Sequence, residues 1–110
     1  MNNDPTLVND IARVTINGKD KYFYSFASKY CSHHNPLNFP IYDSYVEKVL
    51  KYFRNENTLL KFDNNDLKDY KKFKAILIRF KQLYHIEQYS LKDLDRYLWQ
   101  LGKEYFPNKY

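Results

Sequence analysis

The chain has 110 residues, of which 44% are apolar and 19% aromatic, with only 2 glycines and 4 prolines. This length predicts a single domain over residues 1–110, and the scarcity of glycine and proline argues against a turn-rich β fold and favours helices. The net charge of +5 favours an anionic partner, and nucleic acid is the first candidate. The alternative, that the charge serves solubility alone, is about equally consistent with the sequence.

The sequence carries no sign of secretion or membrane insertion. Its single cysteine, Cys31, excludes an internal disulfide and fits a reducing compartment. No apolar run approaches the roughly 20 residues that span a bilayer. The polar start MNNDPTLVND lacks the basic residues and apolar core of a signal peptide. These features predict a cytoplasmic protein without a membrane segment.

Residues 4–36 predict two helices. The first starts at Asp4-Pro5, since proline suits the first helical turn, and its short apolar stripe consists of Leu7, Val8, Ile11 and Ala12. The β-branched residues 14–16 favour an extended piece after it, and NGKD at residues 17–20 is a turn signal. The second helix stops at Asn35-Pro36. Its apolar side is predicted to consist of Phe23, Phe26, Ala27, Tyr30, Cys31 and His34.

A third helix is predicted after the stiff PLNFP loop. It starts at Asp43 or Ser44 and ends near Arg54, and Ser44 and Glu47 have the spacing of a capping box. Its apolar stripe consists of Val46, Val49, Leu50 and Phe53. Residues 54–66 are predicted to be mostly loop.

Two further helices complete the predicted fold. Asp66 is expected to cap the longest helix, whose apolar positions are Leu67, Tyr70, Phe73, Ile76, Leu77, Phe80, Leu83 and Tyr84. The last helix begins at Ser90, with Asp93 at capping-box spacing, and closes at Pro107. Its seam consists of Leu91, Leu94, Leu98 and Leu101. The predicted fold class is therefore all-α, a single compact bundle of about five helices joined by short loops.

The residues that could bind a metal or attack a substrate are few. Cys31 and His34 could share one helix face, but zinc takes three or four ligands and no second ligand pair lies nearby. The adjacent His33 and His34 point about 100° apart on a helix. No glycine-rich phosphate loop is present. The sequence therefore predicts neither a metal nor a cofactor.

Asp43 is distinguished by its position at the start of a predicted helix. A carboxylate there accepts backbone N–H groups and meets the positive end of the helix dipole. In one interpretation Asp43 is only a helix cap. In the other, the same carboxylate serves as a general base or stabilises a developing cation.

The segment ASKYCSHHNPLNFPIYDSYVEKVL, residues 27–50, resembles the catalytic region of the helix-hairpin-helix DNA glycosylases, above all the bacterial branch similar to 8-oxoguanine DNA glycosylases. That superfamily has a motif like Pro-Val-Asp-Thr-His-Val. Its counterpart here, with one residue inserted before the acid, is Pro40, Ile41, Asp43, Ser44 and Val46. The resemblance implies a fold similar to the catalytic half of such an enzyme. It assigns to Asp43 the role of the catalytic carboxylate, which activates the nucleophile or stabilises the sugar cation.

The chain also departs from this superfamily. The hairpin pattern like Leu-Pro-Gly-Val-Gly, whose amides hold a DNA phosphate, is missing, and the nearest glycine is Gly18. Ser25 stands where bifunctional members have a lysine nucleophile, so the resemblance implies a monofunctional hydrolase without a lyase step. The chain is also shorter than a typical glycosylase.

On this hypothesis DNA is the partner. Enzymes that act on a base stack the extruded base on aromatic rings, and Tyr42 and Tyr45 are the tyrosines nearest Asp43. Phosphate contacts are expected from Lys71, Lys72 and Lys74. Packing of the tyrosines in the core or at its rim, and a solvated lysine face, are the structural alternatives.

The second hypothesis is a non-catalytic helical domain that binds another protein, or pairs with itself, through its aromatic surface. The missing glycine hairpin and the short chain favour it. A helix-turn-helix regulator is less favoured, because no short glycine-containing turn joins two suitable helices.

Overall fold

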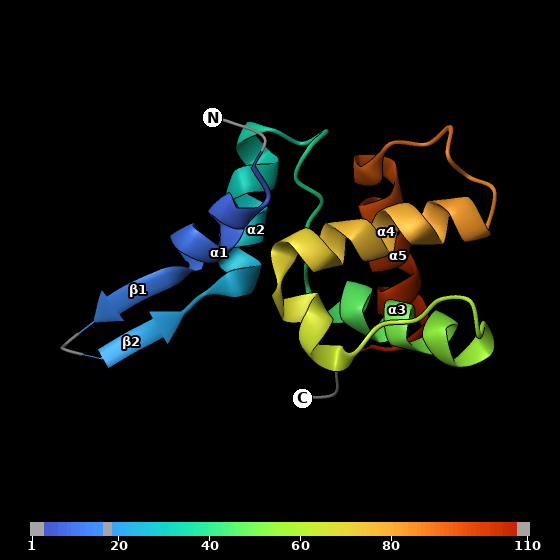
Figure 1. The fold of residues 1–110 in the computed structure, drawn as a ribbon, viewed down its shortest axis with the longest axis horizontal. Helices are drawn as coiled ribbons and strands as arrows, with labels where there is room; N and C mark the ends of the chain where they lie inside the picture. Colours follow the sequence, from blue (N-terminus) through green and yellow to red (C-terminus); the bar gives the residue numbers. More distant parts are fainter. Residues whose placement is uncertain (1–3, 17–18, 108–110) are drawn as a thin grey trace.

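The computed structural model describes residues 4–16 and 19–107. Its elements, in chain order, are α1 (Thr6–Ala12), β1 (Arg13–Ile16), β2 (Lys19–Tyr22), α2 (Tyr24–His34), α3 (Ser44–Glu56), the 3-10 helix η1 (Asn64–Lys68), α4 (Tyr70–Leu83) and α5 (Leu91–Tyr105) (Figure 1). The prediction of a bundle of about five helices is confirmed. The extended piece expected after the first helix is one strand of a two-stranded hairpin.

The hairpin projects away from the helices (Figure 1). Its strands are antiparallel, with Arg13 opposite Tyr22 and Ile16 opposite Lys19. The turn predicted at residues 17–20 is wrong in its second half, because Lys19 and Asp20 belong to β2, while Asn17 and Gly18 lie outside the described residues. The ladder between β1 and β2 thus extends into the second half of the segment predicted to be a turn.

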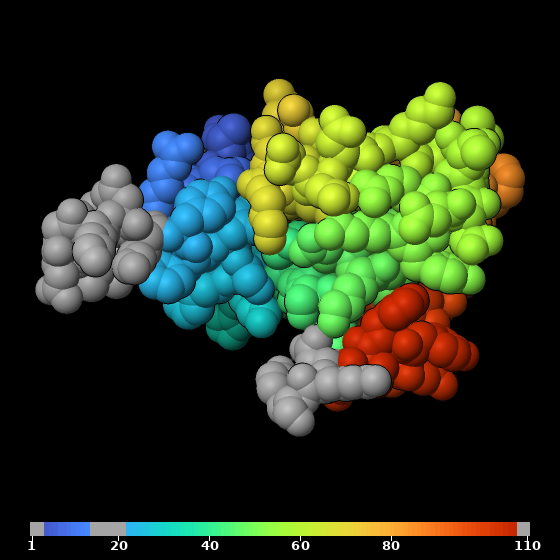
Figure 2. Space-filling model, turned by 90° about the horizontal axis from the view of Figure 1, so that it is seen from below, coloured from blue at the N-terminus to red at the C-terminus, as the bar shows by residue number. Residues whose placement is uncertain are grey.

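The helices pack in two pairs joined by α4. α1 lies beside α2, α3 packs along α5, and α4 contacts both α1 and α5 (Figure 1). From below, the red C-terminal turns of α5 lie against the green residues of α3 (Figure 2). The α3–α5 crossing is close: a Cβ on Gly102 would lie 2.6 Å from the Tyr45 Cβ and 2.8 Å from its carbonyl oxygen.

The core is rich in aromatic rings. Tyr70 and Phe73 are fully buried, and their ring centroids are 5.6 Å apart. Tyr42 packs 5.4 Å from Phe73 and 4.7 Å from Tyr24. The high aromatic content of the sequence is therefore used for edge-to-face and tilted ring contacts between elements.

The face that α2 buries differs from the predicted one. Ala27 and Cys31 are buried as expected, but Phe26 and Tyr30 are 68% and 46% exposed and His34 is also exposed. The buried side is completed by Tyr24, Ser28 and Ser32. Small side chains let α2 approach its neighbours closely and bring hydroxyl groups inside, whereas the spacing of the aromatic residues predicted a neighbouring face that shares only Ala27 and Cys31 with the buried one.

The predicted start of α3 is corrected in one detail. Asp43 is the N-cap, and its Oδ1 accepts the Val46 N–H at 2.9 Å. Ser44 is the first helical residue, so the expected Ser44–Glu47 capping box does not form. Glu47 instead pairs with Lys51 at 2.7 Å. The helix ends at Glu56 rather than near Arg54.

The start of α4 is also corrected. Asp66 lies in η1, where its Oδ2 accepts the Asp63 N–H at 2.9 Å and closes a capping box for that short helix. Asp69 is the cap of α4, with 14 residues, and α5 is longer, with 15. The capping box predicted for α5 is confirmed, since the Ser90 Oγ accepts the Asp93 N–H at 3.0 Å.

Candidate functional site

Asp43 lies at the end of the loop that joins α2 to α3, and its side chain is only 8% exposed. Because its Oδ1 caps α3, the carboxylate has one fixed orientation at the N-terminus of that helix. The predicted role as a helix cap is therefore confirmed. A catalytic role for the same carboxylate depends on its surroundings.

Residues 40–43 form a segment whose backbone is held by side chains from three helices. From α4, the Tyr70 hydroxyl donates to the Pro40 carbonyl oxygen. From α5, the Asp95 Oδ2 accepts the Ile41 N–H at 2.7 Å. Both anchoring side chains are buried, so these bonds are shielded from water and fix the segment on two sides.

Two serines of α2 also form hydrogen bonds with the backbone of this segment. The Ser28 Oγ accepts the Tyr42 N–H at 3.0 Å, and the Ser25 Oγ donates to the Tyr42 carbonyl oxygen at 3.1 Å. Ser28 is fully buried. Buried backbone groups need such partners in the absence of a regular ladder. The extended segment that ends in Asp43 is thereby held in one conformation.

Asp95 is the buried acid on the other side of the segment. Its side chain is 3% exposed, and burial raises its pKa to about 6, although the Ile41 N–H, Lys92 and Arg96 act in the opposite direction. The Lys92 Nζ lies 3.7 Å from the Asp95 Oδ2 and 3.0 Å from the Ser32 Oγ. Lys92 thus connects α5 to α2 next to residues 40–43.

Asp43 and Asp95 line one hollow of about 150 Å³, together with Lys29 and Trp99. It therefore combines two acids, an amine and an indole, which come from α2, the N-cap of α3 and α5. Sequence reasoning found Asp43 and did not single out Asp95 or Trp99. One signal was available, because Asp95 lies four residues after Leu91 and three before Leu98, on the apolar seam of α5 where a charged side chain is costly to bury.

The two tyrosines predicted to stack a base are packed against the protein. The Tyr42 ring is 3% exposed, the Lys68 Nζ lies 4.6 Å from its centroid, and its hydroxyl donates to Glu47. Burial is the main reason that its pKa is raised. Tyr45 is half-buried where α3 crosses α5 at Gly102. The structural alternative, packing in the core and at its rim, describes both.

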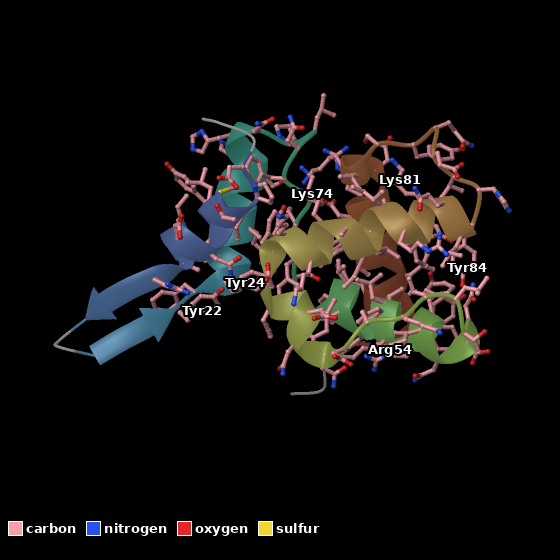
Figure 3. The ribbon with its side chains drawn as sticks, viewed as in Figure 1. Tyr22, Tyr24, Arg54, Lys74, Lys81 and Tyr84 are labelled. Atoms are coloured by element: carbon pink, nitrogen blue, oxygen red, sulfur yellow. The ribbon has the colours of Figure 1, made fainter. Side chains whose placement is uncertain are left out.

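The three predicted phosphate-binding lysines lie on α4, away from the residues that line the hollow. Lys71 and Lys72 are exposed, and the Lys72 Nζ lies 3.6 Å from Asp66. Lys74, labelled in Figure 3, is half-buried, and this burial lowers its pKa. Its Nζ lies 5.9 Å from the centroid of the Phe39 ring. The cations next to the hollow are instead Lys29 and, beside Asp95, Lys92 and Arg96.

The residues considered for metal binding differ in burial and do not form a ligand cluster. Cys31 is buried, which raises the pKa of its thiol. His34 is exposed and packs 4.6 Å from Tyr30. Within residues 4–16 and 19–107, no three His, Cys, Asp or Glu side chains are grouped to hold a metal ion. In the same part of the chain, no helix has the length and apolarity needed to cross a bilayer.

The fold and the site define a small helical domain in which two buried acids, Asp43 and Asp95, lie at the loop segment 40–43, whose backbone is held by side-chain hydrogen bonds. Residues 1–38 match the family model HI_0787_N, described as an N-terminal domain. Over 104 residues the chain is 58% identical to an uncharacterized protein of Haemophilus influenzae, an alignment that covers 94% of this chain and 49% of that protein. The chain thus spans about half the length of the curated relative it matches. No solved structure matches.

Proposed function

We propose that the chain is a DNA-binding module resembling a base-excision DNA glycosylase, with Asp43 as its catalytic carboxylate. The observation that supports this proposal most is the set of side-chain hydrogen bonds that hold the backbone of residues 40–43. Polar side chains of α2, α4 and α5 hold the segment that ends in Asp43, and a reacting group needs this kind of fixed support. In this role Asp43 accepts a proton from the attacking water or stabilises the sugar cation as the base departs.

The charge around the hollow supports an anionic substrate. Lys29 lines it, and Lys92 and Arg96 lie close enough to act on Asp95. Together with the net charge of +5, these cations favour contact with a phosphate backbone. Lys71 and Lys72 extend the proposed contact along the exposed side of α4.

The proposed reaction is hydrolysis without a lyase step. Ser25, at the position of the lysine nucleophile in bifunctional relatives of the superfamily, donates a hydrogen bond to the backbone of Tyr42. The amine that lines the hollow belongs to Lys29, one helical turn further on. We therefore expect no covalent adduct when the protein and abasic DNA are treated with borohydride. An adduct that disappears in Lys29→Ala would contradict this part of the proposal.

Fluorescence anisotropy tests the DNA contact. Duplexes with and without an abasic-site mimic are titrated at two salt concentrations, and we expect tighter binding to the mimic that weakens with salt. The triple variant Lys71→Ala, Lys72→Ala, Lys74→Ala should bind more weakly and with a smaller salt dependence. Absence of binding even at low salt would remove DNA as the partner.

Excision by Asp43→Asn tests the catalytic role. Asparagine is an equally good N-cap, so the variant should fold while losing base release from a panel of damaged duplexes. Ser44→Ala, the neighbouring substitution, should retain base release. Excision that persists in Asp43→Asn would remove Asp43 from the mechanism.

The exposed face of α2 favours a second candidate function, a helical domain that binds proteins. Phe26 and Tyr30 are exposed at a spacing of four residues, and Phe23 and Leu37, also exposed, continue the apolar positions at both ends. Apolar residues gathered on one exposed helix face are typical of protein contacts. Sedimentation of wild type and Phe26→Ser at several concentrations tests self-pairing, since the variant should remain monomeric where wild type associates.

A further inference from the structure

A second and larger cavity lies on the other side of α5 from Asp43. It measures about 700 Å³ and is walled by the C-terminal parts of α3 and α4, the loop that follows α4, and the first turns of α5. Tyr84, labelled in Figure 3, lies where α4 ends and the loop begins. Volumes between about 300 and 1,000 Å³ are usual for small-molecule sites.

The two cavities are distinct. On α5, Asp93 lines the large cavity and Asp95 the hollow of Asp43. Two residues correspond to about 200° around a helix, so the two acids point to nearly opposite sides. Tyr97 and Trp99 repeat this division one turn later. A ligand in the large cavity therefore does not occupy the proposed DNA site.

The floor of the large cavity is a cluster of three aromatic rings in mutual contact. The ring centroids of Phe53 and Phe80 are 5.1 Å apart, those of Phe53 and Tyr84 5.4 Å, and those of Phe80 and Tyr84 4.6 Å. At the rim, Tyr89 and Tyr97 are 52% and 57% exposed. Aromatic faces carry negative potential and attract cations, so these tyrosines add a preference for positive charge to an otherwise apolar wall.

The one charged side chain lining this cavity, among the described residues, is the acid Asp93. It forms no ion pair within the described part of the chain. Its Oδ2 accepts the Ser90 N–H at 3.3 Å, while its Oδ1 has no hydrogen bond or ion pair to the residues that the structure describes. In a chain of net charge +5, an aromatic cavity with a negative rim is a local reversal of sign.

From this combination we propose that the cavity binds a small organic ammonium ion, with an apolar body on the floor formed by Phe53, Phe80 and Tyr84. The cationic head lies between Asp93 and the rim tyrosines. Burial of the body supplies most of the affinity. The head selects the ligand, because the carboxylate and the ring faces both disfavour an anion.

Calorimetric titration with three benzyl compounds tests the proposal. Benzyltrimethylammonium carries a cation, benzyl alcohol is neutral, and benzenesulfonate is an anion, while the ring is common to all. We expect the cation to bind roughly tenfold more tightly than the alcohol, the scale of one good cation–π or charge contact, and the sulfonate more weakly than both. Equal affinities, or no saturable binding of the cation, would overturn the proposal.

Variants locate the ligand. Asp93→Asn keeps an acceptor for the Ser90 N–H and should weaken binding of the cation severalfold, leaving only the smaller preference over the alcohol that the rim tyrosines supply. Tyr97→Ala should weaken the cation severalfold, whereas Tyr105→Ala, an exposed tyrosine of the same helix outside the cavity, should have no effect. A cation preference that is undiminished in Asp93→Asn, or a loss in Tyr105→Ala equal to that in Tyr97→Ala, would also overturn it.

Discussion

The buried carboxylate of Asp95 predicts an unusual dependence of stability on pH. Burial raises its pKa in the folded protein from 3.8 to about 6. Between these values the folded chain holds a proton that the unfolded chain has lost, so the free energy of unfolding falls as the pH rises through this window. The difference corresponds to about 3 kcal/mol, absent above pH 6 and fully present below pH 3.8.

Asp95→Asn isolates this contribution. Asparagine retains an oxygen that can accept the Ile41 N–H, and it does not titrate. Urea unfolding between pH 4 and pH 7.5 should show wild type gaining about 2–3 kcal/mol relative to the variant on acidification. Taking the difference cancels the other acids of the chain, including Glu47, whose lowered pKa contributes in the opposite direction.

Lys92→Gln provides a second test of the same reasoning. Lys92 and Arg96 both lower the pKa of Asp95, and the Lys92 Nζ lies 3.7 Å away. Removal of the Lys92 charge should therefore move the pH window of the stability change upward. Parallel stability curves for wild type and Asp95→Asn over the whole range would refute the assignment of a costly buried charge.

Four further substitutions test the packing and the hydrogen bonds that hold residues 40–43. Gly102→Ala should destabilise by about 1–3 kcal/mol in thermal unfolding, because the new Cβ would lie 2.6 Å from the Tyr45 Cβ. Among the described residues the buried Tyr24 hydroxyl has no hydrogen-bond partner, so Tyr24→Phe should be neutral or stabilising, whereas Tyr70→Phe should cost about 1–2 kcal/mol. Ser28→Ala should cost about 1–3 kcal/mol in urea unfolding, because it leaves the buried Tyr42 N–H unpaired.

Matched variants separate these effects from general sensitivity to mutation. Gln100→Ala, at an exposed site of α5, should leave the melting temperature nearly unchanged. Ser25→Ala should cost less than Ser28→Ala, since Ser25 is only half-buried and binds the carbonyl side alone. Gly102→Ala as stable as wild type, Tyr24→Phe as damaging as Tyr70→Phe, or equal losses in the two serine variants would contradict the corresponding argument.

The helical class was predictable from the sequence, whereas the caps were predictable only in part, since Asp69 caps α4 in place of Asp66 and the Ser44–Glu47 box does not form. The stripe of α3 and the Ser90–Asp93 box are local patterns, and both appear in the structure as predicted. The choice between Asp43 and Ser44 as the cap of α3 was left open, because either residue type suits that position. The structure decides it through the Val46 N–H.

The surroundings of Asp43 were not predictable in the same way. The side chains that hydrogen-bond to residues 40–43 lie as far apart in sequence as Ser28 and Asp95. No helical or strand periodicity in the sequence relates such distant positions. The orientation of α2 was mispredicted because aromatic spacing was given more weight than its small residues. Phe26 is exposed, and Ser28 is buried where it binds the Tyr42 amide.

Trp99 allows the most direct test of the proposed site. It is the one tryptophan of the chain and lines the hollow with Asp43, so its fluorescence reports on that position. On titration with a duplex that contains an abasic-site mimic, we expect a saturable change in Trp99 emission with the same midpoint as the anisotropy signal. Anisotropy that rises while Trp99 emission stays constant would place the DNA elsewhere and leave Asp43 as a helix cap.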